Sequence, residues 1–545
     1  MRFFPLSFSA CAIRILFLVA VSTAGLAGQG WAADIVLHNG KIVTVDEGFS
    51  IAEAVAIEGQ RFSAVGSNQE VLRQAGPGTL VIDLKGKTVV PGLIDTHSHI
   101  HSYAERAYSG DINRPRLTVD WRGVQTKDDV LNQIKGIMDS NQFEPGEWVF
   151  IRSGMSLIGG GTQEQAKILY DDLNRWELDK VTPNNPVAMD HGIPIANGLM
   201  VNSKAIELVW ERYGYFLEKY GRYWVDSEGR PDGHLEPPAT MVFERFLPHP
   251  TPEDVAPVYK KYLEELAAAG TTTVSTKLFP YSLDAYKLLE AKDEMTLRIP
   301  YGMRDFYFGT ILNLEHGMEG LDNLIGSGSG KLWVNSVGAV GVDGAAARAC
   351  TDQRRVNPYG AIDEWWPVGQ CHVDLEYRGA KGKGAPVKEN YYREFIFQSA
   401  RNGVRFANTH VAGDRSHRNM LDIIDEIHQE LGPASTEGWA FDHCGLVNVD
   451  DLPRTAQLGI TLSCYASNIA RGKQTAEVYG NEVAQNFLSP VKSMLDAGVK
   501  VVFEMDRDNY VWHDLEIFIT RTDDEGNVWG PHEAVDRVTA LKMIT

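Results

Sequence analysis

The stretch that decides the fold is VVPGLIDTHSHIH, which runs from Val89 to His101. The segment Leu93 to Thr96 predicts a short β-strand that leads directly into His97. His97 and His99 are two positions apart, so on an extended segment both side chains point to one side, where two imidazoles can bind one divalent ion. His101 continues the alternation, but we assign it to the loop that follows. Solvated or hydrogen-bonded histidines would fit the pair equally, so the rest of the chain has to decide.

After this stretch, apolar strand-like segments alternate with amphipathic helices, an order typical of parallel α/β folds. The segment PEDVAPVYKKYLEELAAAG, residues 252–270, is one such helix, with its apolar residues on one face. Eight βα units predict a TIM (β/α)8 barrel over residues 91–545, and this length requires long βα insertions because a plain barrel needs only ~250 residues. The predicted strands are Leu93–Thr96, Pro186–Met189, Thr272–Ser275, Leu332–Val337, Val404–Thr409, Trp439–Asp442, Ile460–Cys464 and Val499–Phe503.

Two segments precede the predicted barrel. Residues 33–90 contain several short β patterns and predict a small β domain of the sandwich type. Residues 1–32 resemble a secretory signal peptide, because Arg2 and Arg14 are their only charges, a short apolar run follows, and small residues lead to a cleavage point near Ala32. The apolar run is shorter than the ~20 residues of a membrane span. We therefore expect a periplasmic or secreted protein with no membrane segment after cleavage.

The composition limits the partners of the protein. The chain has 545 residues, of which 43% are hydrophobic, and a formal net charge of −20. This acidity argues against nucleic acid and anionic membranes, so we expect a small-molecule substrate; a homo-oligomer is compatible with the composition. Cys350 and Cys371 flank one polar loop and are candidates for a disulfide. Cys444 and Cys464 lie in apolar strand-like runs and are expected to be buried free thiols.

The main functional signal is that four of the predicted strands end in side chains that can bind a metal ion. In TIM barrels the chemistry lies where the strands end, so these side chains are expected on one rim. Asp508 would share a face with Asp506, but Asp506 follows the apolar run directly and is preferred. The first, fifth, sixth and eighth strands end, respectively, in His97 with His99, in His410, in His443 and in Asp506.

These residues resemble the amidohydrolase superfamily, and most closely its branch of formamide-deformylase-like, metal-dependent hydrolases. The segments PGLIDTHSH, VNSKA, GTTTV, VDGAAA and HVAGDR, which begin at residues 91, 201, 270, 342 and 410, are similar to segments of that branch. The resemblance implies a divalent metal, one or two ions, with zinc as the first choice for histidine and carboxylate ligands. The implied ligands are His97, His99, His410, His443 and Asp506.

The resemblance also implies a mechanism in which water activated by a metal ion attacks a C–N bond. Asp506 would take the proton from this water and later deliver it to the leaving amine. His97, His99 and Asp506 would hold the first ion. His410 and His443 would hold a second ion, or one would bind metal while the other donates a hydrogen bond to the substrate carbonyl.

The chain departs from the family pattern in two places. Family members usually carry a carbamylated lysine on the fourth strand that bridges two ions, and the aligned residue here is Ala339. Lys277, just after the third predicted strand, is the nearest substitute; it is either a ligand or an ordinary lysine at the rim, and without a bridge the site holds one ion. Family members also continue beyond Thr545 with strands that complete the small β domain, so we expect that half of the domain to be missing from this chain.

Four further residues are candidates for substrate binding. His191 ends the second predicted strand, His234 lies in an insertion, and Trp365 and Trp366 lie in a loop that either covers an apolar substrate or packs internally. The predicted function is hydrolysis of a non-peptide amide of the N-acyl or N-formyl amine type. Alternatives are a lactonase or carbamate esterase, a mononuclear deaminase, or an inactive barrel that acts as a binding protein.

Overall fold

A computed structural model describes most of the chain as two compact units, which we treat separately. The units are Met1–Pro91 and Gly92–Thr545. The described residues are 32–112, 117–155, 162–191, 198–304, 313–338, 341–344, 348–357, 369–377, 379, 383–506 and 511–545. The predicted signal peptide lies almost wholly outside them. Within the described residues, no helix is long and apolar enough to cross a bilayer.

The first unit is built from two small sheets. One has the order β5-β4-β1-β6 and the other the order β3-β2-β7. Helix α1 (Asn68–Val71) contacts the larger sheet and closes a small apolar core around Val36 and Val71. The strands are β1 (Ile35–His38), β2 (Lys41–Val43), β3 (Ile51–Ala52), β4 (Ala54–Glu58), β5 (Arg61–Gly66), β6 (Leu80–Asp83) and β7 (Thr88–Val89).

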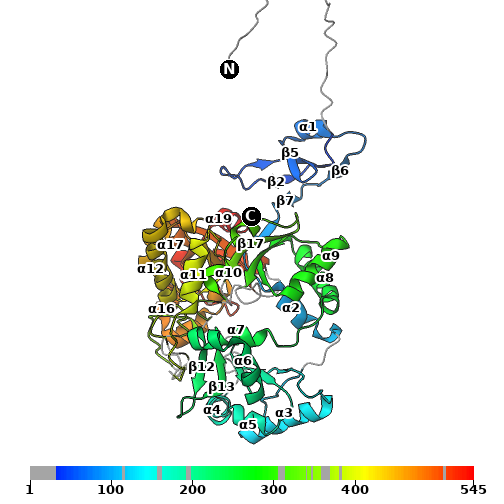
Figure 1. Cartoon of the computed structure of the whole chain (residues 1–545). Helices are drawn as coiled ribbons and strands as arrows, with labels where there is room; N and C mark the ends of the chain where they lie inside the picture. The colour runs from blue at the N-terminus through cyan, green and yellow to red at the C-terminus, as the bar shows by residue number, and fades with distance from the viewer. Residues whose placement is uncertain are drawn as a thin grey trace, which may run out of the picture. The chain divides into compact units, whose positions relative to one another are not determined.

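The second unit is a barrel of parallel strands (Figure 1). Parallel pairs join β8 to β14, β15 to β16 to β17, and β18 through β19 and β20 to β21, and Val337 bridges to Phe406. The ring closes where the Thr96 amide donates to the Phe503 carbonyl, 3.1 Å away. The strands are β8 (Leu93–Asp95), β14 (Thr271–Val274), β15 (Thr276–Leu278), β16 (Ile299–Arg304), β17 (Leu332–Gly338), β18 (His410–Val411), β19 (Ala440–His443), β20 (Thr461–Tyr465) and β21 (Lys500–Glu504).

The structure corrects the prediction for two strands of the ring. The sequence predicts the fifth strand at Val404–Thr409, but it lies at His410–Val411, as β18, with only a single bridge at Phe406 before it. The second correction concerns the sheet that a strand joins. The predicted strand Pro186–Met189 forms, but as β10 (Val187–Asp190) of a separate sheet of order β12-β13-β11-β10-β9. Its place in the ring is taken by β16, which contains Pro300 and Gly302, residues that weaken a strand signal. The separate sheet lies within a long insertion between β8 and β14, as the chain length predicted. Its other strands are β9 (Val149–Ile151), β11 (Leu199–Val201), β12 (Arg222–Val225) and β13 (Pro231–Glu236).

Helices follow most of the ring strands and occupy the insertion. The predicted helix at residues 252–270 forms as α8, because Thr251 and Asp254 make a capping box and its apolar stripe is buried. The longer helices are α2 (Ile100–Ala107), α3 (Lys127–Asn141), α6 (Ser203–Tyr220), α8 (Pro252–Ala268), α9 (Pro280–Ala291), α11 (Tyr391–Arg401), α12 (Asp414–Leu431), α15 (Gly472–Tyr479), α18 (Val511–Thr520) and α19 (Arg537–Ile544). The shorter ones are α4 (Gln163–Lys167), α5 (Arg175–Asp179), α7 (Ala239–Glu244), α10 (Leu314–Gly317), α13 (Leu452–Gln457), α14 (Ser467–Ala470), α16 (Asn481–Asn486) and α17 (Val491–Asp496).

The four described cysteines form two disulfides. Cys350 pairs with Cys371, as predicted. Cys444 pairs with Cys464, so the prediction of two free thiols is wrong. The reason is the register of two neighbouring strands: β19 pairs with β20 so that His443 lies opposite Cys464, which brings the Cα atoms of Cys444 and Cys464 within 5.0 Å.

Candidate metal centre

The strand ends at the rim of the barrel bring the predicted ligands together. One potential ligand atom from each of His97, His443 and Asp506 lies within 4.8 Å of the others. Nε2 of His99 is 3.9 Å from Oδ1 of Asp506, and the rings of His410 and His443 are centred 4.0 Å apart. Side chains from the first, fifth, sixth and eighth ring strands therefore form one cluster.

The backbone at this rim is unusual at two of these residues. His443 has a φ of 91° and Asp506 a φ of 38°, values in the left-handed region that residues with a Cβ rarely adopt. The Asp506 amide donates to the His97 carbonyl, which holds the turn against the first strand. Such strain is maintained only where surrounding contacts fix the backbone, and it is common at functional sites.

A carboxylate contacts Nδ1 of each of three histidines. Nδ1 of His97 is 3.0 Å from Asp442, Nδ1 of His410 is 2.8 Å from Asp343, and Nδ1 of His443 is 2.5 Å from Glu504. A carboxylate at Nδ1 favours the tautomer that carries its proton there, which leaves the Nε2 lone pair for a cation. The three pairs are Asp442 with His97, Asp343 with His410 and Glu504 with His443.

Sequence reasoning missed these carboxylates, although two of them lie beside predicted ligands. Asp442 directly precedes His443, and Glu504 lies two residues before Asp506. Both are buried at the ends of ring strands. A buried acidic residue in an otherwise apolar strand is the signal that could have identified them, because unpaired charges are rarely buried.

Burial controls the charge of the cluster. It lowers the pKa of His99 and of His410 well below the ordinary value, so both imidazoles are neutral and able to act as ligands. Burial also opposes protonation of His97, but the charges of Asp442 and Asp506 outweigh it and raise the pKa of this histidine. His97 thus lies in the negative field of two carboxylates, which favours a cation beside it.

Tyr103 holds Asp506 in place. Its hydroxyl lies 2.6 Å from the Asp506 carbonyl and 2.9 Å from Oδ1 of the same residue. Burial raises the pKa of Tyr103, so the phenol keeps its proton and remains a donor. The tyrosine comes from α2, in the long insertion, and the sequence contains no pattern that singles it out.

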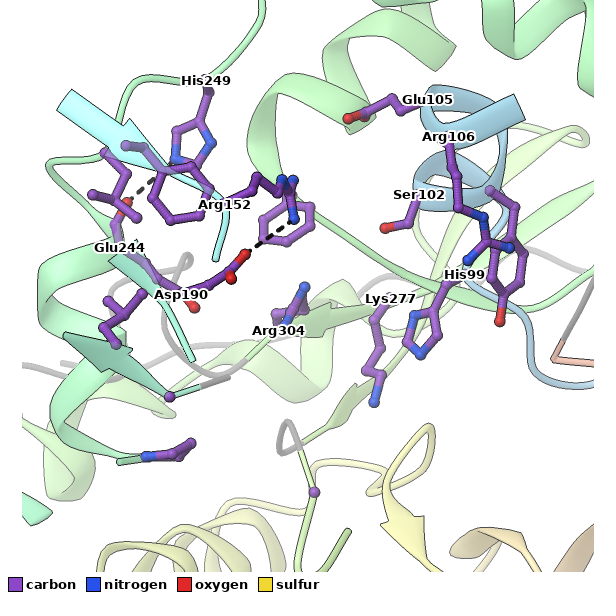
Figure 2. Close-up of a pocket in the computed structure, with 18 of the residues that line it drawn as sticks. His99, Ser102, Glu105, Arg106, Arg152, Asp190, Glu244, His249, Lys277 and Arg304 are labelled. Atoms are coloured by element: carbon purple, nitrogen blue, oxygen red, sulfur yellow. Dashed lines mark hydrogen bonds and ion pairs between the residues drawn. The ribbon is translucent and has the colours of Figure 1, made fainter. Parts of the chain in front are cut away.

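A cavity of about 750 Å³ opens beside the cluster. His99 and the buried Lys277 of β15 reach its wall (Figure 2). His410 also lines the cavity. The wall also contains apolar side chains, among them Phe150, Leu247 and Phe279. This volume suits a small organic molecule, whose surface such pockets largely bury.

The two histidines predicted to bind substrate do not line this cavity. His191 and His234 are buried in the insertion; Nδ1 of His234 is 3.0 Å from Asp232, and neither histidine is among the described residues that line the cavity. The structure therefore gives no support to their predicted role. Trp365 and Trp366 lie outside the described residues, as do Ala339 and Asp508.

The assignment of His101 to a loop is wrong. It is the second residue of α2, and its ring is buried against Phe279, with the two centroids 5.3 Å apart. The helix begins directly after His99, so the extended alternation ends there. His101 consequently does not share the direction of His97 and His99.

The fold and the cluster together define a barrel with a metal-binding rim, and comparison with known proteins gives the family. Residues 80–545 match the model of the amidohydrolase family, so the chain belongs to that family. It is 26% identical over 533 residues to the N-substituted formamide deformylase of Arthrobacter pascens, covering 94% of this chain and 88% of the deformylase. The protein is a metal-dependent amidohydrolase, which sets aside the alternative of an inactive binding protein.

Solved structures share the fold. Uncharacterized metal-dependent hydrolases from Pyrococcus furiosus and Pyrococcus horikoshii superpose with TM-scores of 0.55 and 0.56. They are 20% and 18% identical to this chain, of which each covers 94%, and the chain covers 93% and 91% of them. The TIM-barrel-like α/β fold is thereby shown.

Replacing the carboxylate behind His443 should weaken metal binding. We expect Glu504→Gln to raise the dissociation constant for the divalent metal by about 10- to 100-fold, because the amide no longer fixes the histidine tautomer. The constant can be measured by competition with a chelator. Glu533→Gln is the matched control, since Glu533 is also buried but bonds to Ser493. Equal affinity of Glu504→Gln and the native protein would contradict this role.

Proposed function

We propose that the protein hydrolyses a small non-peptide amide of the N-acyl or N-formyl amine type. The observation that carries this proposal is the cluster of His97, His443 and Asp506 beside a cavity of molecular size. Hydrolysis of a C–N bond fits the family, and the formamide deformylase relative supports an amide as the substrate.

The residues present suit a divalent cation. Nε2 of His97 is buried and makes no hydrogen bond within the described part of the chain, while Nδ1 faces Asp442, and a bare buried nitrogen is a costly arrangement unless a cation completes it. We propose zinc, because it favours nitrogen and carboxylate ligands at such sites. A bound divalent cation supplies Lewis acidity and lowers the pKa of water toward neutrality.

Asp506 is the proposed general base and general acid. Tyr103 donates to Oδ1 of its carboxylate, which fixes the orientation of the group. In that position Asp506 accepts the proton of the attacking water and delivers it to the nitrogen of the leaving amine. His443 is the second proposed catalytic residue: it lies beside Asp506, with Nδ1 4.0 Å from Oδ2, and because its Nδ1 also faces Glu504, Nε2 is left to complete the ligand set.

Loss of a ligand or of the general base should abolish turnover. We expect His97→Ala to bind less than one equivalent of metal, and both this variant and Asp506→Asn to hydrolyse N-formyl-2-phenylethylamine at least about 1,000-fold more slowly than the native protein. Metal is measured by elemental mass spectrometry and amine release by chromatography. His316→Ala, at an exposed histidine, is the control. Full metal content with native turnover in His97→Ala would overturn the assignment.

We also propose that Lys277 is a ligand. It is buried on β15 and lines the cavity together with His99 and His410. An ammonium group there would repel a dication, so the bound state requires a neutral amine or a carbamate formed with carbon dioxide. A carbamate would add the anionic bridge that allows two ions to bind.

Metal content tests this ligand. We expect Lys277→Met to bind about one equivalent of metal fewer than the native protein, because methionine fills the space but cannot form the carbamate. The measurement is the metal-to-protein ratio after dialysis against trace zinc. Native metal content together with native turnover in Lys277→Met would show that the lysine is not a ligand.

Export is a further proposal. The features of residues 1–32 support it, and so do the two disulfides, which persist mainly in oxidising compartments. A full-length chain produced in a bacterial host should reach the periplasm and lose about 32 residues, as intact-protein mass spectrometry would show. Leu18→Arg, which interrupts the apolar run, should remain unprocessed in the cytoplasm. An unprocessed native chain would contradict export.

A further inference from the structure

A buried arginine lies in the wall of the cavity near the cluster. Arg304 ends β16, next to the strand that carries Lys277, and the register pairs Lys277 with Gly302. Only 8% of Arg304 is exposed, yet it lines the cavity together with His99 and Lys277, and Figure 2 shows it projecting between Lys277 and Arg152. The protein as a whole is strongly acidic, so a buried cation in this wall indicates a local requirement for positive charge.

Three of the acidic residues that line the same cavity have partners of their own. Asp190 pairs with Arg152 at 3.6 Å, and Glu105 accepts hydrogen bonds from Tyr259 and Tyr281 at 2.6 and 3.2 Å. Asp343 binds His410 and two backbone amides. These contacts assign three of the acidic groups to structural roles within the protein.

Arg304 is held in a defined orientation. Its guanidinium carbon lies 4.3 Å from the centroid of the Phe279 ring, and this ring stacks on Tyr281 with centroids 5.5 Å apart. A guanidinium that lies on an aromatic face keeps its donors in its own plane, along the edge of the ring. That planar set of donors matches a carboxylate, which it can bind through two parallel hydrogen bonds.

The other residues of the cavity wall indicate the chemical character of the rest of the ligand. Phe150, Leu247 and Phe279 provide apolar surface. His372 adds a neutral donor, because the Arg222 guanidinium, which can only donate, lies 2.6 Å from Nδ1 and so leaves the ring proton on Nε2. The cavity therefore combines a cation, neutral donors and apolar area.

We propose that the substrate is an amide that carries a carboxylate, an N-acyl or N-formyl amino acid with an apolar side chain, and that Arg304 binds the carboxylate. This inference rests on the proposed function. In the reaction, water adds to the acyl carbon and the C–N bond breaks. The acyl part leaves as a carboxylic acid and the nitrogen takes a proton to leave as the free amino acid.

A pair of substrates that differ only in the carboxylate tests the inference. We expect the native holoenzyme to favour N-formyl-DL-phenylalanine over N-formyl-2-phenylethylamine by about 100-fold in kcat/KM, and Arg304→Gln to reduce this ratio to about 3-fold or less. Arg304→Lys, which keeps the charge but loses the planar donors, should give an intermediate ratio. Arg106→Gln removes a charge from an exposed part of the same wall and should leave the ratio within about 3-fold of native.

The outcomes separate this inference from the proposed function. A ratio near one in the native enzyme, or a high ratio that survives in Arg304→Gln, overturns the inference while amide hydrolysis stands. An equal fall of the substrate ratio in Arg106→Gln and in Arg304→Gln also overturns it, because the preference would then come from the overall positive charge of the cavity.

If neither amide is hydrolysed, the proposed function fails and a binding measurement decides the inference. Titration calorimetry compares the binding affinity of 3-phenylpropionate with that of 3-phenylpropan-1-ol. The protein is first stripped of metal with a chelator, so that no metal ion can bind the carboxylate. The inference predicts at least about 10-fold tighter binding of the acid, lost in Arg304→Gln. Equal binding of acid and alcohol, or an unchanged preference in Arg304→Gln, overturns it.

Discussion

Closure of the ring between its first and last strands is the interaction on which the site depends. Asp95, on the first strand, accepts hydrogen bonds from the amides of His97 and Met505, and the Asp506 amide donates to the His97 carbonyl. The two bonds made by the amides of Met505 and Asp506 join residues that are about 400 positions apart in the chain. Without them, Asp506 would not lie beside the histidines that follow the first strand, and the cluster would lose its only carboxylate ligand candidate among the predicted residues.

The site also places a large electrostatic cost on the fold. Burial raises the pKa of Asp95 and of Glu504 well above the ordinary values, because a carboxylate loses its hydration inside the barrel. The charge of Asp442, which pairs with His97, raises the pKa of Glu504 further. The buried acids are tolerated because histidines and backbone amides bind them, and a divalent cation at the cluster would offset their charge further. Metal affinity and folding stability are thus coupled at this rim.

The sequence predicts the barrel and the cluster well, because both depend on local patterns. Apolar runs that end in histidine or aspartate mark four ring strands, and parallel strands necessarily present those ends on one rim. The exchange of β10 for β16 shows the limit of this reasoning. A short apolar segment of sequence does not reveal which sheet it joins. Strand β16 was missed because Pro300 and Gly302 weaken its strand pattern.

Contacts between distant segments could not be predicted in the same way. Tyr103 reaches Asp506 from an insertion, and Arg304 reaches the cavity from a strand that the sequence did not reveal. The Cys444–Cys464 disulfide depends on the register of two strands, which an apolar pattern does not specify. In each case the missing information is three-dimensional proximity, not the chemical character of the residue.

The most direct test of the account is anomalous diffraction from a crystal of the metal-loaded protein, measured on both sides of the zinc absorption edge. The account predicts an anomalous peak at about 2.0–2.2 Å from Nε2 of His97 and from a carboxylate oxygen of Asp506, with Asp442 and Glu504 still at Nδ1 of their histidines. Anomalous density elsewhere, or none at the cluster in a crystal that contains stoichiometric metal, would contradict it.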